Sequence, residues 1–376
     1  MNISKRNTAL DIVRIVAFFS VAAIHFWLHN GYYNEPIVGK PMFVYTTIRT
    51  AFTYCVPLFI ILSGYLLNKK TLSKRYYLGI VKILGIYILA TIGCMLFKHR
   101  CYGDEFTFRS VLFGILDFSG ANYSWYIEMY IGLFLLIPFL NTMYHGLKGK
   151  GQKKVLIWTL VCLTSLPSII NIYNFTEPGW FYAPAISREY QKLAGEWWVM
   201  IYPVTYYMIG AYLKEYPFKM KKRYNLLLFF LAIAGFGLFN YYRNHGAPFF
   251  WDGYRDWFGA QALVLSVLIF SLLSRINTEK FPNAIKKTLA HLSDLCLGAY
   301  LMSYVADSII YPYLARFAPT LDDKFGYFIP AVLSVIAASL LMSEFLNLLY
   351  KAMEWIWKST ANVFSKKKNH QKPNKT

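Results

Sequence analysis

Residues 10–26 read LDIVRIVAFFSVAAIHF, an apolar run interrupted by one arginine, Arg14, and one histidine, His25. Extended to residues 8–29, the run is long enough as a helix to cross the ~30 Å hydrocarbon core of a bilayer. Lys5 and Arg6 precede it, as basic residues precede a signal anchor, but no small-residue cleavage site follows. We therefore expect this segment to be retained as a first transmembrane helix.

Similar apolar runs recur along the whole chain of 376 residues. Only 15% of the residues are charged, against roughly 25% in an average soluble chain. The runs predict spans at residues 8–29, 46–67, 77–97, 124–144, 155–173, 197–213, 226–242, 257–274, 293–313 and 327–350. We expect an all-α fold, a polytopic membrane helix bundle with about ten transmembrane helices.

The formal net charge of +20 could indicate binding to nucleic acid, but its distribution favours a membrane orientation. With the N-terminus inside, the cytoplasmic segments hold 26 of the 39 Lys and Arg residues, as the positive-inside rule requires. These segments are residues 1–7, 68–76, 145–154, 214–225, 275–292 and 351–376. We therefore expect both termini to be cytoplasmic and no nucleic-acid partner.

Residues 1–350 are expected to form the transmembrane domain, with no soluble domain fused at either end. Residues 351–376 form a basic tail with almost nothing to bury, so we expect it to be disordered in the cytoplasm near anionic lipid. The five cysteines are odd in number, and none stands at CxxC or metal-ligand spacing. We expect no disulfide framework and no metal site.

The polar residues of the first span point to chemistry inside the membrane. A charge near the middle of a span costs ~2.5–3.5 kcal/mol, so such residues normally face the protein interior and mark function. Eleven residues at about 100° each place Arg14 and His25 on one helix face, roughly 16 Å apart, so that both can line one cavity. Asp11, one turn before Arg14, is a candidate ion-pair partner.

Each of these two residues has a structural alternative. Arg14 could snorkel to lipid headgroups at the inner interface, and His25 could make a hydrogen bond that only packs helices together. In the functional interpretation, His25 takes a proton from a hydroxyl near neutral pH, while Arg14 holds a phosphate or polarises an acyl carbonyl. His29 follows at the outer boundary, where we expect a solvated side chain.

Four other charged residues in or beside the spans are weaker candidates. Glu128, early in the span 124–144, could orient His25, bind a sugar hydroxyl or form a structural ion pair. Arg49, on the outer side of the second span, could meet Glu128 or an anionic glycan. Asp294 and Asp307 flank the ninth span, where we expect helix capping and solvation.

The segment 10–26 resembles the opening motif of the integral-membrane acyltransferase family 3, whose first helix carries an arginine and, eleven residues later, a histidine regarded as catalytic. Residues 56–67, VPLFIILSGYLL, and residues 125–138, WYIEMYIGLFLLIP, are similar to the second-span and fourth-span motifs of that family. Residues 206–213 and 297–302 are weaker matches. The resemblance implies a stand-alone membrane O-acyltransferase in which His25 and Arg14 are catalytic.

Two positions differ from that family's pattern. An Arg-x-x-Arg pair is common at the start of its third span, whereas this chain has Gly79 and Lys82 there, with Lys74 and Arg75 just before. A histidine common near the ninth span is replaced by residues 302–303, Met and Ser. We expect Lys74, Arg75 and Lys82 to lie near the donor phosphates.

The expected reaction moves an acyl group, acetyl in the usual case, from acyl-CoA to a hydroxyl of a cell-surface or lipid-linked glycan. His25 would act as general base or carry the acyl group transiently. Acetyl-CoA would be a co-substrate, with no tightly bound cofactor, and the enzyme would be a multi-pass protein of a bacterial plasma membrane. The alternative is a transporter or flippase of a glycan or small polar solute, because a polar path through ten helices could also conduct a substrate.

Overall fold

The structure is a computed structural model that describes residues 6–250 and 257–370, and side chains as far as residue 359. Its described residues form helices and connecting loops, and two isolated β-bridges, Pro36 to Pro248 and Ile37 to His245, join the loop after η2 to the loop after α11. The longer helices are α1 (Thr8–His29), α2 (Gly39–Ala51), α3 (Cys55–Leu67), α5 (Val81–Tyr102), α7 (Trp125–Gly146), α8 (Gly149–Thr164), α10 (Tyr202–Glu215), α11 (Lys222–Asn244), α12 (Ala260–Leu273), α13 (Asn283–Leu314) and α15 (Phe328–His370). The short helices are η2 (Tyr32–Asn34), α4 (Lys74–Tyr77), η3 (Leu78–Ile80), α6 (Phe108–Leu116), α9 (Pro167–Ile170), η4 (Pro178–Phe181), η5 (Val199–Ile201) and α14 (Leu321–Gly326).

Seven helical segments of the described chain are long and apolar enough to cross a membrane. They are Thr8–His29, Gly39–Leu67, Lys74–Tyr102, Trp125–Gly146, Lys222–Asn244, Asn283–Leu314 and Phe328–Ser359. The three other predicted spans coincide with the shorter helices α8, α10 and α12. The all-α polytopic bundle is therefore confirmed, whereas the count of ten and the cytoplasmic location of the termini stay predictions.

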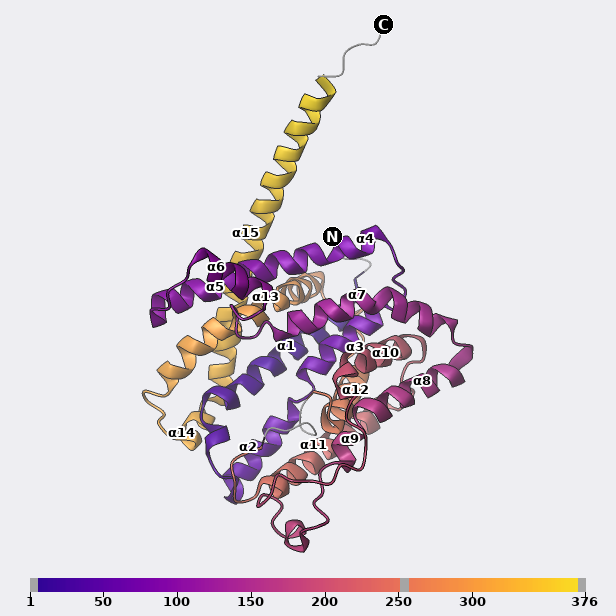
Figure 1. Cartoon of the computed structure of the whole chain (residues 1–376), viewed down its shortest axis with the longest axis vertical. Coiled ribbons are helices and arrows are strands. Elements are labelled where there is room, and N and C mark those ends of the chain that lie inside the picture. The colour runs from indigo at the N-terminus through magenta and orange to yellow at the C-terminus, as the bar shows by residue number, and fades with distance from the viewer. Residues whose placement is uncertain (1–5, 251–256, 371–376) are drawn as a thin grey trace.

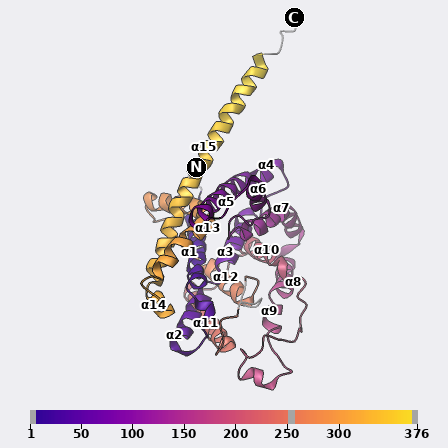
Figure 2. The ribbon, with the colours of Figure 1, turned by 60° about the vertical axis from the view of Figure 1, so that its left-hand side comes forward.

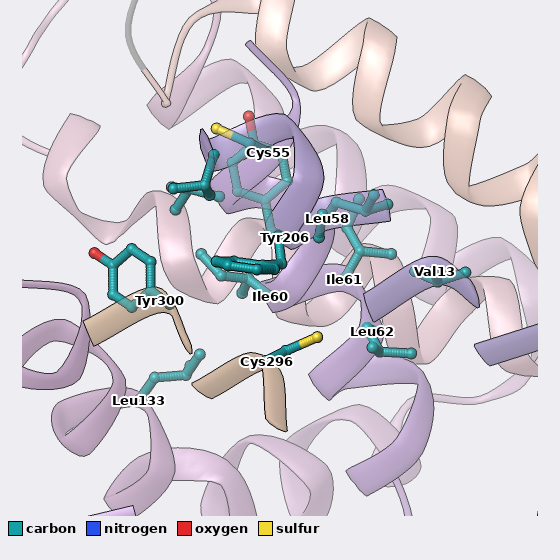
Figure 3. Close-up of a cluster of buried hydrophobic side chains, with 14 of the residues drawn as sticks. Val13, Cys55, Leu58, Ile60, Ile61, Leu62, Leu133, Tyr206, Cys296 and Tyr300 are labelled. Carbon is teal, nitrogen blue, oxygen red and sulfur yellow. The ribbon is translucent and has the colours of Figure 1, made fainter. Parts of the chain in front are cut away.

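Helix α1 lies at the centre of the bundle and packs against α3, α12, α13 and α15 (Figure 1). Asn7 caps its first turn, because the side chain accepts a hydrogen bond from the backbone N–H of Ala9. Buried side chains of α1 and α3, including Val13 and Ile61, share one apolar core with Tyr300 of α13 (Figure 3). The helix that carries Arg14 and His25 is thus enclosed by protein on several sides.

The second predicted span is broken in the structure between α2 and α3. Pro57 stands in the first turn of α3 and has no N–H to donate, which favours a helix start at this point. The first part, α2, packs against α11, and the second part, α3, packs against α1 and α10. The break lets one span contact two different parts of the bundle.

Two glycines allow α3 and α10 to touch along their backbones. A Cβ atom on Gly64 would clash with the carbonyl of Tyr207, and one on Gly210 would clash with the carbonyl of Ile61. Small residues permit this close approach in membrane bundles, where van der Waals packing drives helix association. The contact fixes α3, one wall of the cavities described below.

Helix α15 continues beyond the predicted end of the transmembrane domain and projects away from the bundle (Figure 2). Residues 351–358 are exposed, and the helix runs on to His370, where the sequence analysis expects a disordered tail. Good helix formers at Ala352 to Trp355 continue the pattern without a Gly or Pro to end it. Residues 371–376 of the predicted tail lie outside the described part of the chain, and the domain boundary at residue 350 stays a prediction.

Candidate active site

His25 lies near the C-terminal end of α1 and is paired with a buried carboxylate. Its Nδ1 is 2.9 Å from Oδ2 of Asp307, which projects from the adjacent helix α13. The Asp307 side chain is fully buried and that of His25 is 11% exposed. A carboxylate on Nδ1 fixes the orientation and tautomer of the ring, which directs Nε2 toward a substrate.

Asp307 also organises two residues beside His25. The hydroxyl of Tyr123 donates to Oδ2 of Asp307 at 2.9 Å, and Nε2 of His29 is 2.7 Å from the same hydroxyl. Tyr300 in turn donates to the backbone carbonyl of Tyr123 at 2.6 Å. His29 is exposed, as expected, but its ring joins this network and stacks on Tyr311.

A cavity of about 280 Å³ lies against His25. It is lined by Val21, Ile24, His25, Leu28, Cys55, Val56, Tyr123, Trp125, Trp257 and Tyr300. The rings of Trp125 and Trp257 are nearly parallel, with centroids 6.1 Å apart and an interplanar angle of 7°. Histidine is the single titratable base among these described lining residues, and aromatic surface covers much of the wall.

A second cavity, of about 340 Å³, contains Arg14. Arg14 is half-buried, and its Nη1 donates to Oγ of Ser293 on α13 at 2.7 Å. Besides Val21 of α1, the other lining residues come from α3, α5, α7, α13 and α15, and include Ser63, Lys82, Tyr126, Tyr130 and Asp294. Arg14 therefore faces the interior of the bundle, which disfavours the alternative of an arginine that snorkels to headgroups.

The two cavities adjoin each other. Val21 of α1, Val56 of α3 and Tyr300 of α13 line both of them. The prediction that Arg14 and His25 line one cavity is wrong, because they lie in two neighbouring cavities with a common wall. The shared face of α1 remains the element that connects them.

The predicted pairing of Asp11 with Arg14 is wrong. Asp11 accepts hydrogen bonds from Arg6 instead, with distances of 2.5–2.9 Å, and is buried beneath it. Arg6 comes from the turn before α1 and can approach Asp11 from the helix end, whereas Arg14 is drawn toward Ser293 on α13.

The outer candidates do not join His25. Glu128 is exposed on α7, and the carboxylate that orients His25 is Asp307. Arg49 is 1% exposed; its Nε donates to the Tyr33 hydroxyl at 2.8 Å and its guanidinium lies 4.2 Å from the centroid of the Phe249 ring. These contacts give Arg49 a packing role beneath the outer loops, away from the residues that line either cavity.

The basic candidates on the inner side divide into two groups. Lys82 is exposed at the start of α5 and also lines the cavity of Arg14. Lys74 and Arg75 are exposed on α4, the short helix that precedes it in Figure 1. Lys82 is thus the one of the three that the structure brings to the Arg14 cavity.

The family model described as an acyltransferase domain, acyltransferase family 3, matches residues 7–344 of the chain. The chain belongs to this family. Neither a curated protein nor a solved structure matches it. This family 3 member is therefore an acyltransferase of the membrane, and its matched region includes every residue that lines the His25 cavity and all but Asn347 of those that line the Arg14 cavity.

Asp307 and Tyr123 are the residues of this acyltransferase that sequence reasoning missed. The expectation that Asp307 caps a helix or is solvated is wrong, because Asp307 lies on the face of α13 that packs against α1 and is fully buried there. The cost of a carboxylate inside a span was the available signal. Tyr123 lies in a loop before α7, and no spacing in the sequence relates it to His25.

Proposed function

We propose that this enzyme transfers an acyl group, acetyl in the first instance, from acyl-CoA to a hydroxyl of a cell-surface or lipid-linked glycan. The observation that carries the proposal is the His25–Asp307 pair beside an aromatic cavity that adjoins the cavity of Arg14. One cavity then serves the donor and the other the acceptor. The predicted orientation places this reaction in the plasma membrane of a bacterium, with the acceptor outside.

The cavity that contains Arg14, called the inner cavity from here on because the predicted orientation places it toward the cytoplasm, suits the acyl end of the donor. Its wall is largely apolar, as a pantetheine arm requires, and Arg14 offers a planar guanidinium that can hold an oxygen of the donor and so orient its acyl end toward His25. Lys82 is exposed at the rim of this cavity, where it could bind a phosphate of the coenzyme that remains outside. Lys74 and Arg75 lie on the preceding helix, α4. No tightly bound cofactor enters the proposed reaction.

The chemistry balances with His25 as the proton acceptor. Nε2 of His25 takes the proton of the acceptor hydroxyl while its oxygen attacks the thioester carbonyl. The C–S bond breaks, the O-acyl ester forms, and the proton passes from His25 to the departing thiolate of the coenzyme. Asp307 stabilises the imidazolium that exists between these two proton transfers.

The cavity beside His25, called the outer cavity from here on, suits a sugar ring. Trp125 and Trp257 present flat aromatic surface, against which the apolar C–H face of a pyranose can pack, and ligand sites commonly combine such walls with a few polar groups. The Tyr123 hydroxyl and His25 supply polar atoms beside that wall. This composition supports an acceptor that is uncharged where it meets His25.

The direct test is mass spectrometry of surface glycans from cells with and without the enzyme. The proposal predicts an acetyl-sized mass difference on a sugar residue, lost again when His25 is replaced by Ala. Purified enzyme in detergent should also release free coenzyme A from acetyl-CoA when the glycan is added. Identical glycans and no acceptor-dependent release would contradict it, and would reopen transport as the function.

A further inference from the structure

The guanidinium of Arg6 joins the beginnings of α1 and α13. Its Nε is 2.9 and 2.8 Å from the two carboxylate oxygens of Asp11. Its Nη1 and Nη2 donate to Oδ2 and Oδ1 of Asp294 at 3.1 and 3.0 Å, and Nη2 also donates to the carbonyl of Ala290 at 3.0 Å. Arg6 therefore holds both oxygens of two carboxylates at once.

Both carboxylates lie in the neighbourhood of Arg14. Asp11 precedes Arg14 by three residues on α1, a spacing at which side chains of a helix can pair. Asp294 follows Ser293, the residue to which Arg14 donates, and lines the same cavity as Arg14. In the structure, however, the partner of Arg14 is the neutral hydroxyl of Ser293 and not a carboxylate.

A carboxylate is a stronger partner for a guanidinium than a hydroxyl, because the hydrogen bond is then assisted by opposite charge. If Arg6 did not hold Asp11 and Asp294, each carboxylate could form an ion pair with Arg14 and draw it away from Ser293. The hydrogen bond to Asp11 is also the main cause that raises the pKa of Arg6 above its ordinary value, so Arg6 keeps its charge at any physiological pH.

We propose that Arg6 is a positioning residue for acyl transfer: by occupying Asp11 and Asp294 it keeps the guanidinium of Arg14 available to the donor in the inner cavity. Arg6 itself need not touch the donor. The inference rests on the proposed function, because the task of Arg14 toward acyl-CoA belongs to it. It adds a second arginine, outside the first span, on which the reaction depends.

The test is a rescue experiment on purified full-length enzyme, with acetyl-CoA as donor and rates normalised to folded protein. Arg6→Ala should lower kcat/KM by about tenfold or more, equivalent to about 1.4 kcal/mol of transition-state stabilisation. The triple variant Arg6→Ala, Asp11→Asn, Asp294→Asn should recover most of that loss, because no carboxylate remains to capture Arg14. Arg223→Ala, which removes an exposed arginine of α11, is the matched control and should not change the rate.

Arg6→Ala leaves Asp11 buried without its partner, so it could fail to accumulate in the membrane. Arg6→Lys avoids this, because it keeps a charge near Asp11 but lacks the planar fork that reaches both carboxylates. It should show a partial loss of kcat/KM, and Asp294→Asn in the same chain should restore the rate. This pair decides the question if the alanine variant does not fold.

Three results would overturn the proposal. One is an unchanged rate per folded molecule in both Arg6 variants. Another is a loss that removal of the carboxylates does not restore, which would mean that Arg6 contacts the donor itself. A third is a loss confined to the amount of folded protein, which would mean a structural role. If wild-type enzyme shows no transfer from acetyl-CoA, the proposed function fails first, so the two failures are distinguishable.

Discussion

The two cavities that adjoin along α1 differ in the side chains that line them. The inner cavity brings together Arg14 and Lys82 on a largely apolar wall, whereas the outer one has aromatic rings and a single titratable base, His25. An anionic thioester is suited to the first and a neutral sugar to the second. In the proposed reaction, one helix would thus present a group that binds the donor, Arg14, and a proton acceptor, His25.

The largest effect is expected at His25, because it serves both substrates. His25→Ala should reduce acetyl transfer by about 10²–10⁴-fold, the usual loss of a general base. His25→Gln keeps hydrogen bonding but cannot titrate, so it should be equally inactive. Surface acetylation, normalised to the amount of enzyme in the membrane, is the measurement. Substantial activity in the Gln variant would show that His25 only packs helices.

Asp307→Asn should have the next largest effect. The amide keeps the shape of the carboxylate but cannot stabilise the imidazolium, so we expect a loss of at least about 10²-fold in turnover. The Michaelis constant for acetyl-CoA should change little, because Asp307 lies away from the inner cavity. His29→Ala is the control within the same network, and it should be milder because His29 lies farther from Asp307, at 3.6 Å against 2.9 Å for His25, and does not line the cavity. An Asn variant as active as wild type would remove Asp307 from the mechanism.

Arg14→Lys is the corresponding conservative substitution in the inner cavity. Lysine keeps the charge but loses the planar fork, so the variant should be impaired nearly as much as Arg14→Ala, by about 10²-fold if both arms of the fork hold the donor. Steady-state kinetics with acetyl-CoA is the measurement. A lysine variant close to wild type would indicate that Arg14 contributes charge alone.

The smallest effect on activity is expected for single cysteine substitutions that report the membrane topology, because these positions lie outside both cavities. Cysteines at Lys150 and Lys222 should resist an impermeant thiol reagent in intact cells, and one at Glu105 should react, since all three positions are exposed. The background would carry serine in place of the exposed Cys101 and Cys162. The reverse labelling pattern would mean that the two cavities face the opposite sides of the membrane.

Much of the fold could be predicted because it depends on local patterns. Length and hydropathy located a helix at every predicted span, and the in-phase spacing of Arg14 and His25 predicted a shared helix face. The broken span at Pro57 was visible as a proline but was interpreted as part of one continuous helix. Three short helices, α8, α10 and α12, show why the number of spans was harder to predict than their positions.

The partners inside the site could not be predicted in the same way. His25 and Asp307 are 282 positions apart, so their contact depends on how α1 packs against α13 and not on any spacing. Helical spacing predicts that Asp11 pairs with Arg14, but Arg6 contacts Asp11 from the end of the helix. Tertiary packing decided both pairings.

The division between the two cavities is the central claim, and paired Michaelis constants test it most directly. Lys74, Arg75 and Lys82 replaced together by Gln should raise the constant for acetyl-CoA and leave that for the glycan acceptor unchanged. The double variant Trp125→Leu, Trp257→Leu should raise the constant for the glycan acceptor and leave that for acetyl-CoA unchanged. This crossed pattern is the predicted result, and both sets of substitutions raising the same constant would contradict it.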